Sequence, residues 1–224
     1  GLHAVNNLLA FGISAAVVRF DQMDDPASTL RRLARKHDVP RNLRRLAEAH
    51  GDITYIAGDG DVADALGAMR SMLAHRWQAG EGPRLFRSPA LEAFTRESVA
   101  ELVAADLGRV DSLTAGGRRL TVSTIFQVDD RQVGDNTVVD PDFSRFGPGH
   151  AALAFQLEHA VETGVRELDL RAGDFPHKQR WANATIRTRS LSLTAPGRQG
   201  DVLRRARRVA MSVRSRRLAR LSAI

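Results

Sequence analysis

The sequence predicts an α+β fold in which helices flank a mixed, mostly antiparallel sheet. Three β-rich segments come in succession at residues 109–115, 118–128 and 132–139. They are separated by Gly116-Gly117 and Asp129-Asp130, and short turn sequences of this kind indicate hairpins. A further strand is expected at residues 165–170, where Leu168 and Leu170 alternate with acidic residues. Three antiparallel strands, a helix and a returning strand therefore form the predicted core.

The residues before this core add elements on its N-terminal side. Periodicity and turn residues predict strands at 14–20 and 53–57 and helices at 27–37, 42–50, 62–77 and 88–107. Turn residues at 80–83 are the expected boundary. We therefore expect a partial N-terminal lobe at 1–80, a main domain at 81–197 and an Arg-rich C-terminal helix at 198–224.

A loop rich in glycine leads into the helix of the predicted core. Pro148 lies between two glycines, and proline is favoured in the first turn of a helix. Backbone N–H groups at such a helix start are expected to be unpaired and to bind a phosphate or pyrophosphate. The same pattern also fits an ordinary turn and helix start. The candidate anion-binding residues are Arg145, Gly147, Gly149, His150 and Ala151, with the unpaired N–H groups expected on the last three.

Polar residues follow the strand that comes after this helix. Leu153, Leu157 and Val161 lie four residues apart, which predicts a helix with one buried stripe that ends at Gly164. The carboxyl end of the next strand is the edge where sheets of this kind usually bind ligands. The candidate catalytic residues at this edge are Asp169, Asp174, His177 and Lys178.

Residues 145–181 resemble the acyl-CoA-binding half of the Gcn5-related N-acetyltransferase (GNAT) superfamily, in the branch of cellulose-biosynthesis-associated acetyltransferases. The family pattern is a Pro-Gly loop, a helix ending in Ala-x-x-x-Gly, a strand with Asp, a Gly, and Tyr-Lys-x-x-Trp. His177 stands where the family has tyrosine. The resemblance covers about residues 43–195, including the linker-like segment 43–77. The matching positions are Pro148-Gly149, Ala160 to Gly164, Asp169, Gly173 and His177-Lys178-Gln179-Arg180-Trp181.

The resemblance implies an acyltransferase of the GNAT fold that uses acetyl-CoA or another acyl-CoA as co-substrate. The loop would hold the pyrophosphate, and strands that splay apart would admit the pantetheine arm. An amine or hydroxyl of a sugar or other polar acceptor would attack the thioester directly, with help from a general base. The tyrosine that protonates the thiol in many relatives is not evident, because the one tyrosine, Tyr55, lies far upstream.

Two of the catalytic candidates have further support from their residue types. His177 has a side chain that titrates near neutral pH, although a histidine next to a lysine can equally be an ordinary surface residue. Lys178 is one of two lysines in a chain that has 31 arginines, so it is not there for general charge. Its ammonium could neutralise an oxyanion or lose its proton on burial, or simply pair with Asp169 or Asp174. Trp181 is expected to anchor the loop in the core.

Charge is concentrated at the C-terminal end. Residues 198–224 contain nine arginines and one acid, a net charge of +8, whereas the whole chain carries +7. This segment has a helical apolar stripe, so it could pack on the domain, lie on an anionic membrane or bind RNA. No apolar run is long enough to cross a bilayer, and a cytoplasmic protein is expected, with a peripheral place at the inner face of the membrane as the alternative. The absence of cysteine excludes disulfides and thiolate chemistry, and the histidines lack metal-ligand spacing such as HExxH, so no metal is expected.

Two other functions remain open at this stage. Peptidoglycan-bridge aminoacyl transferases have a related fold and use aminoacyl-tRNA, which an Arg-rich tail could hold. A degenerate transferase that only binds its ligand is the other alternative. The sequence does not identify the acceptor or the oligomeric state.

Overall fold

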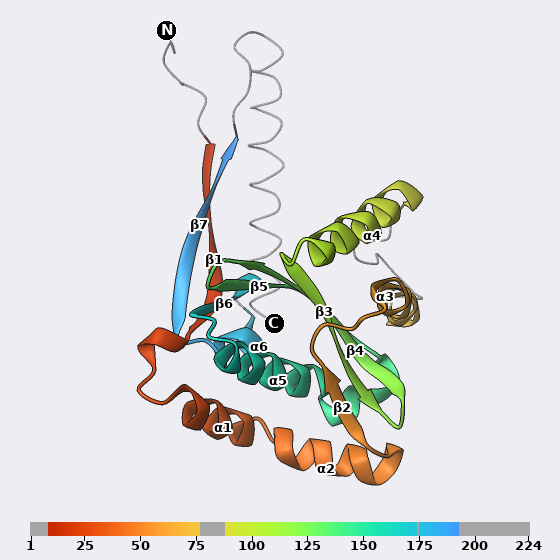
Figure 1. Cartoon of the computed structure of the whole chain (residues 1–224). Helices are drawn as coiled ribbons and strands as arrows, with labels where there is room; N and C mark the ends of the chain where they lie inside the picture. Colours follow the sequence, from red (N-terminus) through yellow and green to blue (C-terminus); the bar gives the residue numbers. More distant parts are fainter. Residues whose placement is uncertain (1–8, 77–87, 174, 193–224) are drawn as a thin grey trace, which may run out of the picture. The chain divides into compact units, whose positions relative to one another are not determined.

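The computed structural model of the protein describes residues 9–76, 88–173 and 175–192 (Figure 1). Its helices and strands, with 3₁₀ helices marked η, are β1 (Leu9–Arg19), η1 (Phe20–Gln22), α1 (Pro26–Lys36), α2 (Val39–His50), β2 (Ile53–Ile56), α3 (Val62–Arg76), α4 (Pro89–Ala104), β3 (Gly108–Ala115), β4 (Arg118–Val128), β5 (Arg131–Val139), η3 (Pro141–Phe146), α5 (Pro148–Glu162), β6 (Glu167–Ala172), α6 (Pro176–Gln179) and β7 (Ala184–Ser192).

The strands form one sheet of seven in the order β2-β3-β4-β5-β6-β1-β7. The pairs β2–β3, β3–β4, β4–β5 and β1–β6 are antiparallel, and β5–β6 is parallel. The predicted α+β fold with a mixed, mostly antiparallel sheet is therefore confirmed. The three hairpin strands of the prediction are β3, β4 and β5, and the predicted bounds of β4 agree with the structure.

Helices cover both faces of the central strands. Val110 and Leu113 in β3 are an odd number of residues apart, so they point to opposite faces of the sheet. Val110 packs in a buried cluster with side chains of α3 and α4, whereas Leu113 packs in another with side chains of α1 and α5. Figure 1 shows α5, with α1 and α2 beyond it, across the sheet from α3 and α4. Helix α5, which carries the predicted loop at its start, thus lies directly on the sheet.

Local sequence explains where the helices begin. The Asp25 carboxylate accepts a hydrogen bond from the Ser28 N–H at 2.9 Å, and the Ser88 hydroxyl accepts one from the Leu91 N–H at 3.2 Å. Each is a side-chain N-cap, and a proline follows each cap in the first turn. Sequence reasoning missed α6 and β7, which are a short turn of helix and a strand next to β1.

The chain divides into two compact units, residues 15–186 and residues 1–14 with 187–224. The described parts of the smaller unit are residues 9–14 of β1 and 187–192 of β7, and everything below concerns residues 15–186. The expected boundary at residue 80, Asp174 and the Arg-rich helix at 198–224 lie outside the described residues. The proposed lobe division therefore stays a prediction. Among the described helices, none is both long and apolar enough to cross a membrane.

Candidate functional site

A cavity opens where two neighbouring strands stop pairing. β5 and β6 pair only from Arg131–Glu167 to Val133–Asp169, although both strands continue beyond this point. Past the last pair, Arg171 of β6 reaches across to Asp135 of β5. Its Nη1 donates to the Asp135 carbonyl oxygen at 2.7 Å and also to the Asp135 carboxylate. Beyond the last backbone pair, the two strands are thus connected by the Arg171 side chain in place of ladder hydrogen bonds.

The cavity has a volume of about 680 Å³ and brings together the loop, α5, both strands and α6. Its lining residues are Arg76, Gly134, Asp135, Asn136, Thr137, Val139, Pro141, Ser144, Gly147, Pro148, Gly149, His150, Leu153, Gln156, Leu168, Leu170, His177 and Lys178. The predicted anion loop and the predicted catalytic segment therefore face the same space, although they are about 28 residues apart in the sequence.

The loop before α5 corrects one detail of the prediction. Gly147 has a φ of 60° and forms the N-cap of α5, and its carbonyl accepts the N–H groups of His150 at 3.0 Å and Ala151 at 3.3 Å. The sequence predicted that these two N–H groups would be unpaired. They are hydrogen-bonded within the chain because the helix starts immediately at Pro148. No backbone acceptor for the Gly149 N–H occurs in the described part of the chain. A Cβ at Gly149 would lie 3.2 Å from Val139 Cγ2, so glycine allows the loop to approach β5 closely.

Three of the five predicted anion-binding residues line the cavity, namely Gly147, Gly149 and His150. The two others lie elsewhere. Arg145 is exposed, and its guanidinium lies 4.7 Å from the centre of the Phe146 ring. The side chain of Ala151 is buried in the core with α1. In the loop, the Gly149 backbone N–H and the His150 side chain are thus the predicted groups at the cavity that are not used to begin α5.

His150 is held in one tautomer by Trp181. The Trp181 indole N–H donates to His150 Nδ1 at 3.2 Å, so a neutral His150 carries its proton on Nε2. The imidazole of His37 stacks on His150 at 5.5 Å and lies 4.9 Å from the Trp181 ring. Burial, followed by the charges of His37, His177 and Arg180, lowers the pKa of His150. A neutral imidazole with an N–H at the cavity is a hydrogen-bond donor that carries no charge.

The lowered pKa of His150 predicts that stability falls in acid. The folded state favours the neutral ring, whereas the unfolded chain takes up a proton near its ordinary pKa of about 6.5. The unfolded state therefore binds more protons, and the free energy of unfolding should decrease as the pH falls below about 6.5. His150→Gln retains an acceptor for the indole N–H and does not titrate, so denaturant unfolding of this variant should depend less on pH. An equal dependence in both proteins would contradict the prediction.

The predicted catalytic residues separate into two groups. His177 and Lys178 line the cavity. Burial and the charge of Arg171 lower the pKa of Lys178, whereas the charge of Asp169 raises it. Burial and the charge of Lys178 lower the pKa of His177. Asp169 does not line the cavity, and its carboxylate accepts the backbone N–H of Arg171 at 2.6 Å. Asp169 thus supports the end of β6, where Arg171 has a φ of 65°.

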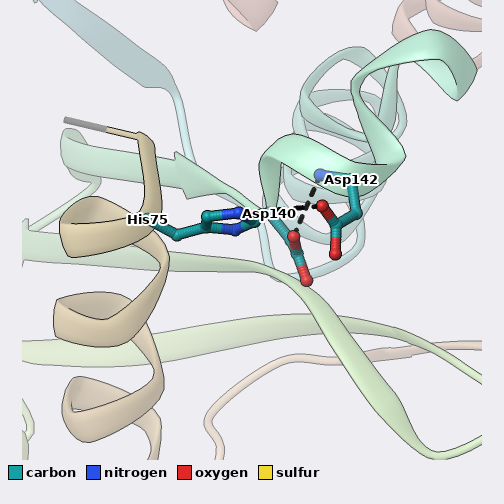
Figure 2. A group of neighbouring side chains, drawn as sticks. All are labelled: His75, Asp140 and Asp142. Atoms are coloured by element: carbon teal, nitrogen blue, oxygen red, sulfur yellow. Dashed lines mark hydrogen bonds and ion pairs between the residues drawn. The ribbon is translucent and has the colours of Figure 1, made fainter. Parts of the chain in front are cut away.

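Near the cavity, His75, Asp140 and Asp142 have ligand atoms within 4.8 Å of one another (Figure 2). A cation is already present among these carboxylates, because Arg118 Nη2 lies 2.7 Å from Asp140 Oδ2 and 3.0 Å from Asp142 Oδ2. Asp140 also accepts the Asp142 N–H at 3.1 Å as the N-cap of η3. Ion pairing and capping account for this cluster without a metal.

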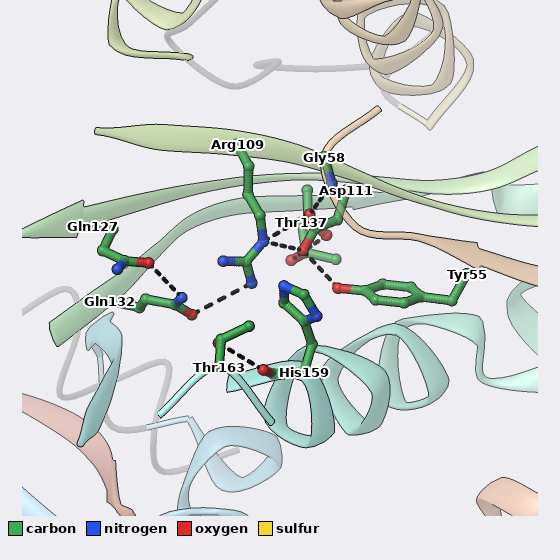
Figure 3. A network of polar contacts seen from close by, with 10 residues as sticks. Tyr55, Gly58, Arg109, Asp111, Gln127, Gln132, Thr137, His159 and Thr163 are labelled. Carbon is green, nitrogen blue, oxygen red and sulfur yellow. Dashed lines mark hydrogen bonds and ion pairs between the residues drawn. The ribbon is translucent and has the colours of Figure 1, made fainter. Parts of the chain in front are cut away.

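A second polar cluster lies between α5 and the sheet and contains Tyr55 (Figure 3). The Tyr55 hydroxyl donates to the buried Asp111 carboxylate at 2.6 Å, and Arg109 Nε donates to the same carboxylate at 2.9 Å. Arg109 Nη2 also donates a hydrogen bond to Gln132 Oε1 at 3.3 Å. Burial is the largest cause that raises the pKa of Tyr55 far above its ordinary value, and the negative charge and hydrogen bond of Asp111 raise it further. Tyr55 thus donates its hydroxyl proton to Asp111, and it is not among the residues that line the cavity.

Sequence reasoning missed several residues of the site. On β5, Gly134 to Thr137 line the cavity, but in the sequence they are part of an ordinary hairpin strand. Gln156 lies in the middle of α5, where a glutamine gives no local signal. It is nevertheless only 4% exposed and lines the cavity. Burial and strand separation, which are both properties of the assembled fold, identify these residues.

The loop before α5 and the separation of the parallel strands β5 and β6 agree with the arrangement that the resemblance to the GNAT superfamily implies. Residues 34–179 match the family described as Acetyltransferase (GNAT) domain. The chain belongs to this family, and the expected GNAT-like fold is confirmed. No curated protein sequence matches the chain.

Solved structures share the fold at low sequence identity. L-PGS from Bacillus licheniformis has a TM-score of 0.56 at 11% identity, over 89% of this chain and 66% of that one. A conserved protein of unknown function from Bacteroides thetaiotaomicron has a TM-score of 0.55 at 7% identity, over 84% and 63%. FemX has a TM-score of 0.53 at 10% identity, over 80% and 59%. The chain thus spans less than two thirds of the length of these structures.

Proposed function

We propose that the protein transfers an acetyl or other acyl group from acyl-CoA to an amine or hydroxyl of a polar acceptor. The observation that carries the proposal is the cavity between β5 and β6, which the Gly147–Gly149 loop lines together with His177 and Lys178. The family assignment as an acetyltransferase domain supports the same reaction. In this proposal the loop binds the pyrophosphate, and the pantetheine arm extends between the separated strands.

The chemistry requires the removal of one proton and the release of one thiolate. The acceptor nitrogen or oxygen attacks the thioester carbonyl carbon, the C–S bond breaks, and the acceptor loses its proton. Lys178 and His177 are the cavity-lining groups that can accept this proton, because a lowered pKa makes their neutral forms more available. The departing thiolate then takes a proton from the protonated base or from water.

Acyl-CoA binding tests the proposal directly. Acetyl-CoA at about 100 times its dissociation constant is expected to raise the free energy of unfolding by about 2.7 kcal/mol, measured by thermal or denaturant unfolding. ATP at the same concentration is the control for general nucleotide binding. The absence of a shift with acetyl-CoA and with longer acyl-CoAs would overturn the proposal.

The acceptor class is a finer part of the proposal. The resemblance of residues 145–181 to cellulose-biosynthesis-associated acetyltransferases supports a saccharide acceptor and a place in polysaccharide biosynthesis. The arginines at 198–224 would then hold the protein at an anionic membrane surface on its cytoplasmic side. Turnover of acetyl-CoA with amino sugars, monitored as thiol release, tests the acceptor class.

A second function stays open because peptidoglycan-bridge aminoacyl transferases have a related fold. The solved structures that share the fold of this chain include L-PGS and FemX. In this alternative the donor is aminoacyl-tRNA, and the Arg-rich segment binds RNA with a steep dependence on salt. Salt-sensitive tRNA binding without any response to CoA would favour it. A third possibility is a degenerate module that binds CoA without turnover of any acceptor.

A further inference from the structure

Exposed arginines on helices α1 and α2 form a charged surface. Residues 31–48 contain six arginines, one lysine and two acids, a net charge of +5. The whole chain carries +7 and residues 198–224 carry +8, so residues 1–197 carry −1 in all. The part of the chain before residue 198 is thus net acidic outside these two helices. The basic face consists of Arg32, Arg35, Arg41, Arg44 and Arg45, which are all exposed.

The buried sides of α1 and α2 turn these arginines outward. Leu30 and Ala34 of α1 and Val39 of α2 pack in the buried cluster that also contains side chains of α5. With about 3.6 residues per turn, the arginines lie on the opposite sides of their helices. Because α1 and α2 pack on α5, which lies between them and the sheet (Figure 1), both charged sides point away from the sheet. The basic face is therefore one surface built by two neighbouring helices.

The basic face has no acidic partners among the described residues. None of its five arginines takes part in a salt bridge there. Arg31, the sixth arginine, interacts with Glu158 of α5 and is therefore left out of the face. Arg41 and Arg45 are four residues apart on one helix, and like charges at this spacing destabilise it. An anionic partner would remove this repulsion.

The exposed cations continue from α2 to the edge of the cavity. The guanidinium carbons of Arg45 and Arg145 lie 5.8 and 4.7 Å from the centre of the same ring, that of Phe146. Arg145 is exposed, and Phe146 directly precedes Gly147, which lines the cavity. A partner that covers the basic face would therefore lie close to the candidate site.

The composition of the two helices distinguishes between anionic partners. Guanidinium groups pair with the phosphates of lipids and of nucleic acids alike. Proteins that hold single-stranded nucleic acid also present aromatic side chains on which bases stack, but residues 26–50 contain no Phe, Tyr or Trp. Clusters of about four to eight Lys and Arg residues on amphipathic helices are typical of binding to anionic lipid headgroups. The observations thus favour a lipid surface.

We infer that the basic face docks the protein on a bilayer of anionic phospholipids. The exposed large apolar side chains of the described residues all lie outside α1 and α2, so the contact is electrostatic and inserts no side chain into the bilayer. Such binding is lost at high salt, because ions screen the attraction. The inference is independent of acyl transfer and of the Arg-rich segment 198–224.

Co-sedimentation of the full chain with vesicles tests the inference. The unmodified protein should bind vesicles of phosphatidylglycerol and phosphatidylcholine in equal parts, and should not bind vesicles of phosphatidylcholine alone. Arg32→Gln/Arg44→Gln should lower the partition coefficient about 30-fold, since each basic residue at an anionic surface contributes roughly a factor of five. The control, Arg70→Gln/Arg96→Gln, removes the same charge from exposed arginines of α3 and α4, across the sheet. It should bind normally, because salt screens charges beyond about 10 Å.

Each other outcome would overturn the inference. An equal loss in the two variants would mean that net charge alone determines binding. Unchanged binding of Arg32→Gln/Arg44→Gln would place the contact elsewhere, since residues 198–224 are intact in both variants. Failure of the unmodified protein to bind the anionic vesicles, or stronger binding to duplex RNA than to them, would exclude lipid as the partner. Thermal unfolding should show both variants folded, because glutamine is a good helix former and the replaced side chains are exposed.

Discussion

Trp181→Ala is expected to lower the free energy of unfolding by about 3–5 kcal/mol, because it empties the site of a large buried aromatic side chain. Trp181 is 1% exposed and is among the largest fully buried side chains of the described residues. For a chain of 224 residues, each kcal/mol corresponds to a change of about 2–4 °C in Tm. Denaturant and thermal unfolding should therefore both show a large effect.

The same substitution should also change the cavity, because Trp181 fixes the tautomer of His150. Trp181→Phe separates the two effects. It retains a buried six-membered aromatic ring and removes the pyrrole part of the indole together with its N–H, so its expected cost is about 1–3 kcal/mol, less than that of Trp181→Ala. Phe94→Ala is the control, since Phe94 is 65% exposed and its loss should change stability by no more than about 0.5 kcal/mol. Equal stability of Trp181→Ala and the control would contradict the packing role of Trp181.

The role of Trp181 as an anchor was predicted from the sequence, and much of the fold was as well. The hairpins of β3, β4 and β5 have local signals, since Gly116-Gly117 and Asp129-Asp130 mark the turns. Strand β7 has no such signal. Its residues include Arg and Thr without clear alternation, and its place beside β1 depends on a contact between opposite ends of the chain. Pairing of this kind cannot be read from local sequence.

The candidate site shows the same limit. The loop at Gly147 to Gly149 and the pair His177-Lys178 could be identified because their residue types and spacing are distinctive. The hydrogen bonds from the His150 and Ala151 N–H groups to the Gly147 carbonyl could not be predicted, because they depend on where α5 begins. Gln156 and the bridge from Arg171 to Asp135 arise only when β5 and β6 separate. Strand register and burial determine these features, and neither has a local sequence signature.

Lys178→Met is expected to reduce kcat of acyl transfer by about 10²- to 10⁴-fold, the range typical for loss of a general base. Lys178 lines the cavity, and its Nζ lies 5.4 Å from the centre of the Phe175 ring. Burial and the charge of Arg171 lower its pKa, which makes the neutral amine more available as a proton acceptor. The rate in the unmodified protein should therefore rise with pH through this lowered pKa, and the rise should be absent in Lys178→Met.

Two variants determine whether Lys178 acts as a base or as a positive charge. Lys178→Arg retains the charge but cannot lose its proton, so a base role predicts that it is as inactive as Lys178→Met. Nearly full activity in Lys178→Arg would contradict that role and leave Lys178 as a charge that neutralises an anion. Lys36→Met is the control because Lys36 is the other lysine of the sequence and is exposed on α1. Its kcat should be unchanged, since a base acts only within hydrogen-bond reach of the proton that it removes.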